Sequence, residues 1–95
     1  MGIIVGLCTV ELFIPESQSL KDKRRVLLSL KVRLREKFNL SVAEVGGQDL
    51  WQKAVVGLAC VANEGRYVNQ VCEQALNLIR SVPAVEIVQS RVELL

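Results

Sequence analysis

The order in which the hydrophobic spacing changes along the chain limits the possible folds more than any other feature of the sequence. Residues 3–14 are rich in Val, Ile and Leu, and every even position among them is apolar, which predicts a strand with one face in a core. From Leu20 the spacing becomes helical, and the apolar stripe consists of Leu20, Leu27, Leu30, Leu34 and Phe38. A strand is therefore followed by an amphipathic helix.

The second half of the chain continues with two strands, a helix and a last strand. Residues 40–45 and 53–62 indicate two strands, joined as a hairpin by a loop over residues 46–52 that begins with the turn pair Gly46 and Gly47. The second helical stripe ends before Pro83 and contains Val68, Val71, Cys72, Ala75, Leu78, Ile79 and Val82. Residues 84–94 predict a strand with one apolar side (Val88, Val92, Leu94) and one polar side that faces solvent (Gln89, Arg91, Glu93).

Capping residues predict where the helices begin and end. Ser19 followed three residues later by Asp22 is a variant of the capping box, so the first helix should begin near Leu20. Asn39 is a plausible end for that helix, and Asn63 is the expected cap of the second helix.

These elements together predict an α+β fold of the ferredoxin-like βαββαβ type. In that fold two helices lie on one face of a four-stranded antiparallel sheet, and each helix serves a right-handed crossover. The 95 residues contain no linker, internal repeat or low-complexity tract, so we expect a single domain over residues 1–95. The fold alone does not determine a function, because it hosts binding modules, enzymes and ribosomal components.

Positive charge is concentrated in the first helix. The whole chain carries only +2, but residues 21–37 hold eight of the twelve basic residues against two acids, which gives +6 there and −4 elsewhere. On a helical wheel five of these cations share one flank: Lys21, Arg24, Arg25, Lys31 and Arg35. The other three, Lys23, Arg33 and Lys37, are spread around the wheel. The flank suits phosphate groups, although a charged helix face that only keeps the protein in solution explains the pattern about as well.

If RNA is bound, the sequence favours contacts to its backbone rather than to its bases. Base stacking on an exposed sheet would require aromatic residues in the central strands. The third strand contains none, and the first contains only Phe13. We therefore expect the flank of the first helix to contact phosphates with little base specificity.

A second candidate surface lies on the sheet and at the tip of the hairpin. The odd positions of the first strand are apolar at one end, which suggests association through the sheet face or edge. Trp51, the only tryptophan, lies in the hairpin loop, where it would either cover the end of the hairpin or anchor an interface. The residues expected at such an interface are Phe13, Gln48, Asp49 and Trp51.

The sequence contains little that could perform catalysis or bind a metal. Histidine is absent, so the serines lack a base partner, and Cys8, Cys60 and Cys72 lie in apolar runs at spacings that match no zinc site. The acylphosphatases, small enzymes of the same topology, carry an arginine in a glycine-rich loop after the first strand, whereas residues 15–18 here contain neither. We expect no catalytic residue, no metal and no cofactor.

The distribution of cysteines and apolar residues also predicts the compartment. An odd number of cysteines without a secretory signal favours the reducing cytoplasm. Glu11 and Pro15 interrupt the first apolar stretch before it reaches the length of a membrane span. The apolar side of the basic helix is needed to cover the sheet, so we expect no membrane partner.

Two stretches of the chain together carry a resemblance to a known family. They are SLKDKRRV at residues 19–26, and VAEV at 42–45 leading through QDLWQKA at 48–54 to Gly57. The combination resembles the YlxP-like family of small bacterial proteins, a domain of unknown function, over nearly the whole chain. Gly46 and Gly47 stand where that family usually has a more polar pair. The resemblance implies a ferredoxin-like fold, a cytoplasmic location and genes often found beside those for a translation initiation factor and a ribosome-binding factor, but no reaction.

Two functional hypotheses follow from the sequence. The preferred one is a non-catalytic module that binds RNA or the ribosome through the basic flank of the first helix. The alternative is a protein-interaction or self-association module, such as a homo-oligomer, that uses the sheet face and the loop around Trp51.

Overall fold

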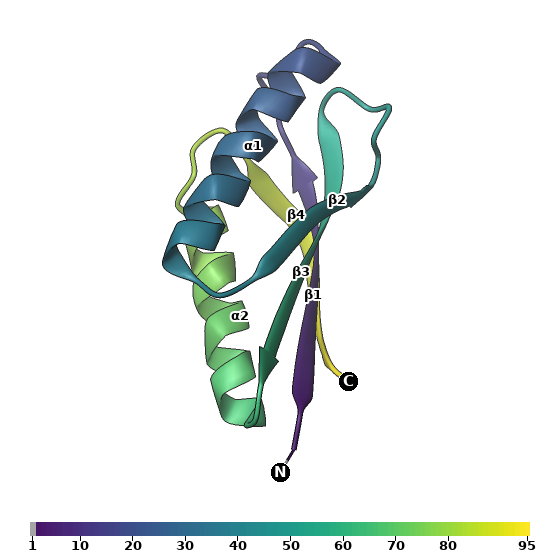
Figure 1. The fold of residues 1–95 in the computed structure, drawn as a ribbon. Helices are drawn as coiled ribbons and strands as arrows, with labels where there is room; N and C mark the ends of the chain where they lie inside the picture. Colours follow the sequence, from purple (N-terminus) through teal and green to yellow (C-terminus); the bar gives the residue numbers. More distant parts are fainter. Residues whose placement is uncertain (1) are drawn as a thin grey trace.

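The computed structural model describes residues 2–95 and has the predicted order of strands and helices (Figure 1). The elements are β1 (Ile4–Phe13), α1 (Leu20–Lys37), β2 (Ser41–Gly46), β3 (Lys53–Ala62), α2 (Gly65–Arg80) and β4 (Glu86–Leu94). The strands form one antiparallel sheet in the order β2-β3-β1-β4. This is the ferredoxin-like arrangement, so the predicted fold class is confirmed.

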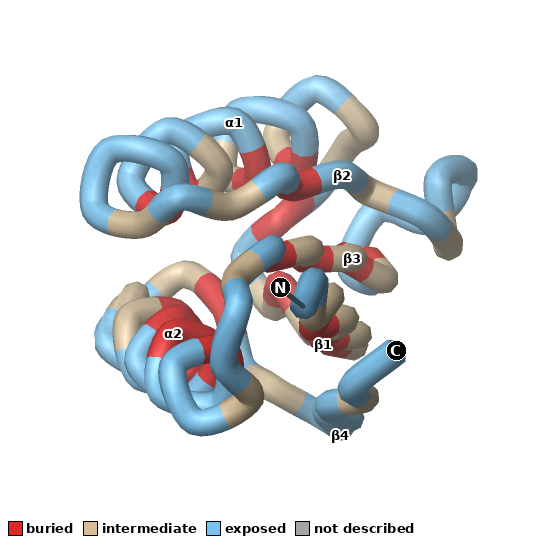
Figure 2. The backbone as a smooth tube through the Cα atoms, turned by 60° about the horizontal axis from the view of Figure 1, so that its bottom comes forward, coloured by how far each residue is buried: buried red, intermediate tan, exposed pale blue. Residues whose placement is uncertain are grey.

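Both helices cover the same face of the sheet, and no element formed by residues 2–95 lies over the opposite face (Figures 1 and 2). α1 lies over β2, whereas α2 lies over β1, β3 and β4. The two helices are staggered along a molecule with principal extents of 48 × 21 × 18 Å. No helix within residues 2–95 has both the length and the apolar character that crossing a membrane requires.

The core lies between the helices and the sheet, as the strand alternation predicts. The buried residues of β1 include Cys8, Val10 and Leu12, and all three cysteines are buried free thiols. α2 approaches β1 closely at Gly6, where an added Cβ would overlap the side chain of Val68. A larger residue at position 6 would therefore displace the Val68 side chain.

The start of α1 confirms the predicted cap, and the start of α2 does not. The Ser19 hydroxyl accepts a hydrogen bond from the backbone N–H of Asp22 at 3.0 Å, and the Asp22 carboxylate accepts one from the N–H of Gln18 at 3.0 Å. The prediction that Asn63 caps α2 was wrong, because the N-cap is Glu64 and its side chain makes no capping bond. The missing capping bond costs little stability here, because the buried face of α2 holds the helix in place.

The apolar side of β4 is less buried than an alternating strand suggests. Val88, Val92 and Leu94 are exposed to 58%, 38% and 48%. The register with β1 shifts between Glu11 and Leu12, which leaves Val88 without a paired residue opposite it. β4 is also an edge strand, so one of its sides has no neighbouring strand to shield it.

Candidate nucleic-acid interface

The outer side of α1 presents a dense positive surface. Leu27, Leu30 and Leu34 are buried against the sheet, so the opposite side of the helix faces outward (Figure 2). Seven basic residues lie on this side or its flanks, all exposed except the half-buried Lys31: Lys21, Arg24, Arg25, Lys31, Arg33, Arg35 and Lys37. None of the seven forms an ion pair with a carboxylate within residues 2–95. We call these seven residues the α1 basic surface.

Four of the five residues predicted to bind phosphate lie at the start of α1 or on the flank over β2. Lys21 is exposed in the first turn. Arg24 and Lys31 line a hollow of about 250 Å³. The Arg35 guanidinium donates a hydrogen bond to the carbonyl oxygen of Val42 at 3.0 Å, so this side chain also ties α1 to β2. Arg24 and Lys31 are thus freer than Arg35 to accept a ligand.

The fifth predicted residue, Arg25, lies on the other flank of α1. It lines a hollow of about 240 Å³ with Arg33 and with Ala84 of the segment before β4. An adjoining hollow of about 670 Å³ lies between Arg33, Lys37 and Asn77 of α2. Sequence reasoning did not single out Arg33 and Lys37, because a helical wheel shows neither of them beside the other cations. The positive surface therefore extends around α1 toward α2.

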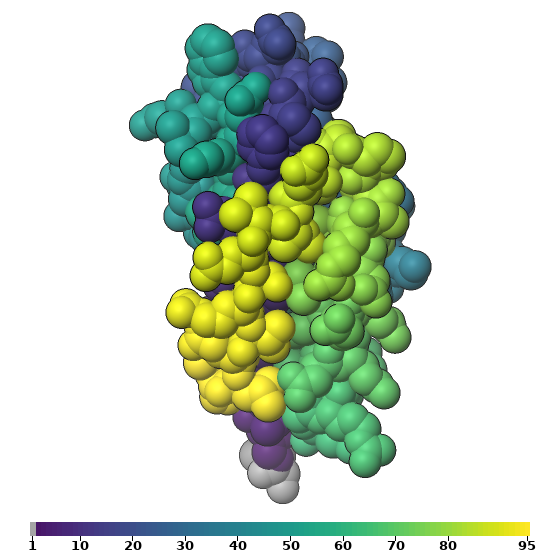
Figure 3. All heavy atoms as spheres, turned by 180° about the vertical axis from the view of Figure 1, so that it is seen from behind, coloured from purple at the N-terminus to yellow at the C-terminus, as the bar shows by residue number. Residues whose placement is uncertain are grey.

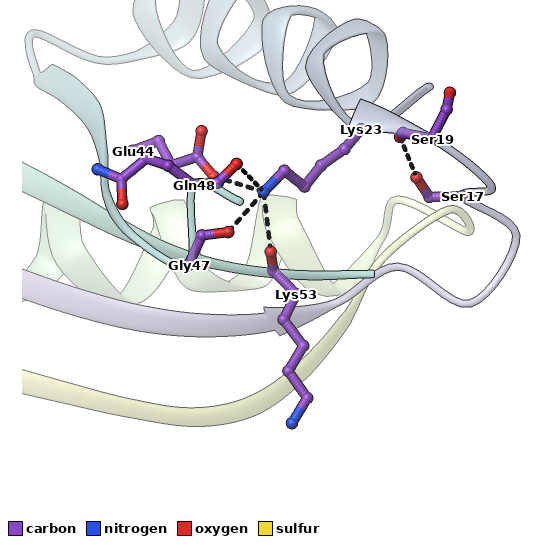
Figure 4. Close-up of polar contacts among 7 residues, drawn as sticks. All are labelled: Ser17, Ser19, Lys23, Glu44, Gly47, Gln48 and Lys53. Atoms are coloured by element: carbon purple, nitrogen blue, oxygen red, sulfur yellow. Dashed lines mark hydrogen bonds and ion pairs between the residues drawn. The ribbon is translucent and has the colours of Figure 1, made fainter. Parts of the chain in front are cut away.

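Lys23 contributes to the charge of +6 over residues 21–37 but does not belong to this surface. The residue is fully buried, and its Nζ donates hydrogen bonds to the carbonyl oxygens of Gly47 (2.8 Å), Gln48 (3.3 Å) and Lys53 (3.1 Å) (Figure 4). Oε2 of Glu44 lies 3.0 Å away as an ion pair. That oxygen is buried without a hydrogen-bond partner, so the ammonium is what compensates its charge. Gly47 has a φ of +71°, a conformation that favours glycine.

Gln52 connects the hairpin loop to the segment between β1 and α1. Its Nε2 donates hydrogen bonds to the carbonyl oxygens of Pro15 at 3.0 Å and Ser17 at 3.1 Å, and its own carbonyl accepts one from the N–H of Ile14 at 2.8 Å. Gln52 thus holds the loop before α1 against the hairpin, and Lys23 holds α1 itself against the hairpin. The two stretches that carry the family resemblance therefore meet in space, where they form a structural clamp.

The clamp leaves the tip of the hairpin loop exposed. Gln48, Asp49 and Trp51 face solvent, and Leu50 is half exposed. Trp51 is 57% exposed, so it does not cover the end of the hairpin. Phe13, the other predicted interface residue, is half-buried and pairs with β3 in the sheet ladder. The loop thus presents an exposed aromatic side chain on a backbone that is held from both sides.

The thiols are poorly suited to nucleophilic chemistry. Burial, with contributions from Cys72 and Glu73, raises the pKa of Cys8 to about 11. Burial also raises the pKa of Cys60 and of Cys72. A cysteine attacks as its thiolate, so these residues stay protonated and unreactive near neutral pH. Across residues 2–95, no three side chains of His, Cys, Asp or Glu gather as metal ligands.

A family and a relative that are similar to this chain are both described without an activity. The model of a family described as "Protein of unknown function (DUF503)" matches residues 5–92. The uncharacterized protein YlxP of Bacillus subtilis (strain 168) is 34% identical over 90 residues, which cover 95% of this chain and 98% of that protein. The resemblance inferred from residues 19–26 and 42–57 is thereby confirmed.

Proposed function

This chain belongs to the DUF503 family, and we propose that it is a non-catalytic cytoplasmic module that binds the phosphate backbone of RNA through the α1 basic surface. Ribosomal RNA is the first target to test, because it is the most abundant structured RNA that a cytoplasmic protein meets. The protein would position or accompany RNA rather than alter it chemically.

The observation that carries this proposal is the set of seven α1 cations, none of which has a carboxylate partner in the described part of the chain. From Lys21 to Lys37 the helix rises about 24 Å at 1.5 Å per residue. A ligand with one anion cannot use positive charge spread over that length. A nucleic-acid strand can, because it repeats a phosphate at every nucleotide.

The kinds of cation also fit phosphate groups. Four of the seven are arginines, whose planar guanidinium groups bind two phosphate oxygens at once. Lys21, Arg24 and Arg25 lie at or near the exposed start of the helix, next to the clamp that fixes its position. These exposed side chains therefore project from a helix whose position is held, which favours contacts to a backbone of variable sequence.

Recognition of particular bases receives less support from the geometry. The exposed sheet face offers only Phe13 among the aromatic residues of β1 and β3, and that side chain is half-buried. Without a row of stacking residues, affinity should come mainly from charge. We expect the binding constant to fall with salt by a logarithmic slope of about −0.7 per single-stranded phosphate neutralised.

The test measures binding of the folded protein to a fluorescent single-stranded RNA and to purified ribosomes across a salt series. The informative variant is Arg24→Glu/Arg25→Glu/Lys31→Glu, which leaves the Arg35 hydrogen bond and the Lys23 clamp intact. Its matched control is Lys53→Glu/Arg66→Glu/Arg80→Glu, which changes the net charge equally at exposed positions outside α1. Circular dichroism of both proteins verifies folding.

The proposal predicts that wild type binds at 50 mM salt and that the α1 variant loses at least tenfold in affinity with a shallower salt slope. The control variant should lose much less. Two results would overturn the proposal: no binding of wild type to either RNA at 50 mM salt, or an equal loss in both variants. The second result would mean that net charge alone governs binding.

A further inference from the structure

The face of the sheet that carries no helix has an apolar end. Along β1, alternate side chains point to this open face, and the register places Val5 opposite Val61 and Leu7 opposite Ala59. Beside them, the N–H of Leu95 donates a hydrogen bond to the carbonyl oxygen of Val5 at 2.8 Å, so the residue that follows β4 still lies alongside β1. We call the apolar group at this end of the open face the terminal patch: Ile3, Val5, Leu7, Ala59, Val61 and Leu95.

Three residues of the terminal patch are open to solvent, and the other three, Val5, Leu7 and Ala59, are half-buried. Ile3, Val61 and Leu95 are exposed to 71%, 62% and 69%, whereas Cys8 and Cys60 on the helix side of the same strands are exposed to 0% and 2%. Figure 3 shows β4 and the start of β1 at the molecular surface, with α2 beside them rather than over them. A contiguous apolar surface of this kind marks an interaction site in a soluble protein.

We propose that a second copy of the chain packs on the open face, with the terminal patches meeting around a two-fold axis. The 35 residues of the four strands each cover about 16 Å² of the sheet plane, from a rise of about 3.3 Å and a strand spacing of about 4.8 Å. One copy therefore offers about 550 Å², and a pair buries about 1,100 Å² in total, which exceeds the roughly 1,000 Å² expected of a specific interface.

The open face carries charges of both signs, so it has no strong field of one sign that would repel an identical copy. Glu11 lines a shallow hollow with Arg91, and Lys53 lies opposite Phe13 at the far end. Next to the terminal patch, Arg91 Nε lies 3.1 Å from Glu93 Oε1, and Glu93 is opposite Leu7 in the ladder. The two charges compensate each other, so this rim would not repel its own copy. A strongly charged face would instead select a partner of opposite sign.

The α1 basic surface does not oppose such a dimer either. This surface lies on the other side of the sheet from the open face (Figure 2). In the dimer the two sheets pack about 10 Å apart, and each carries its helices on the outside. The α1 helices of the two copies are therefore separated by about 30 Å. Charges at that separation are largely screened at physiological salt, where the Debye length is about 8 Å. Both helices remain on the outside, so the dimer neither requires nor prevents RNA binding.

Analytical ultracentrifugation of the full chain between 1 and 100 µM tests this interface. Wild type should approach twice the chain mass of 10.5 kDa, and high salt should not dissociate it, because the contact is apolar. Val61→Asp should weaken association at least tenfold. Ile3→Asp should act in the same direction, and it lies outside the strand ladder, so it should not disturb folding.

The matched control is Leu28→Asp, because Leu28 has the same exposed fraction as Val61, 62%, but lies on α1. This variant should remain dimeric, and circular dichroism verifies the fold of all three variants. A wild-type protein that is monomeric at 100 µM would overturn the proposal. So would a dimer that both patch variants leave intact, or one that Leu28→Asp dissociates, since the interface would then lie elsewhere.

Discussion

Replacing Lys23 by methionine should destabilise the fold strongly, although a surface lysine in the same helix should be dispensable. Methionine keeps an unbranched apolar side chain but removes the ammonium that bonds three carbonyl oxygens and compensates Glu44. The substitution would leave a carboxylate oxygen buried without a partner. The carbonyl oxygens of Gly47, Gln48 and Lys53 would lose a donor at the same time.

The structure sets the expected magnitude. Removing one member of a buried ion pair costs about 3–5 kcal/mol. The Glu44 side chain keeps 17% exposure, so we expect a loss near the lower limit of that range, about 3 kcal/mol. For a domain of this size each kcal/mol corresponds to about 4–8 °C, which predicts a decrease in Tm of about 12–24 °C.

Trp51 provides the assay, because the only tryptophan of the chain lies in the loop that Lys23 holds. Urea unfolding followed by tryptophan fluorescence reports the loop, and far-ultraviolet circular dichroism reports the whole fold. In Lys23→Met the fluorescence transition should occur at lower urea. The double variant Lys23→Met/Glu44→Gln should regain part of the lost stability, because it no longer buries an unpaired charge.

The control is Lys21→Met, which changes an exposed cation two residues away and should alter the free energy of unfolding by no more than about 0.5 kcal/mol. If Lys23→Met also changed it by less than 1 kcal/mol, the reasoning that the buried ammonium holds α1 to the hairpin would be wrong.

Three further predictions concern the core and the first helix. Burial raises the pKa of the Cys8 thiol from 9.0 to about 11. The stabilisation from burying the protonated thiol is therefore complete below pH 9 and is lost as the pH rises to 11. In urea melts over that pH range, wild type should lose up to about 3 kcal/mol more unfolding free energy than Cys8→Ala. Gly6→Ala should lower stability by about 1–3 kcal/mol through overlap with Val68, and thermal unfolding should show rescue by Val68→Ala. Ser19→Ala should cost about 1 kcal/mol in the same assay, because the N–H of Asp22 loses its acceptor.

Much of the fold could be predicted because the relevant signals are local. The bounds of β3 at Lys53 and Ala62 and the cap at Ser19 agree with the sequence patterns. The cap of α2 was predicted wrongly, because Asn63 suits a capping position but the helix begins two residues later, after Glu64. Packing of the buried face of α2 outweighs that local preference.

The candidate site was only partly predictable. Position along a helix determines which cations share a side, and this places Arg24 and Lys31 together. The hydrogen bond from Arg35 to Val42 and the approach of Arg33 to α2 depend on elements that the helical wheel does not contain. The exposed Trp51 likewise depends on how the clamp orients the loop.

The sequence by itself determined the order of the elements, the buried faces of β1 and of both helices, and the concentration of positive charge in α1. Only the tertiary structure decided that Lys23 is buried while its neighbours stay in solvent, because its carbonyl partners lie 24 to 30 residues away along the chain. The spacing of apolar residues shows only which side of a helix or strand is apolar. The burial of a charge depends on which distant groups compensate it, and that is established only when the helix packs against the sheet.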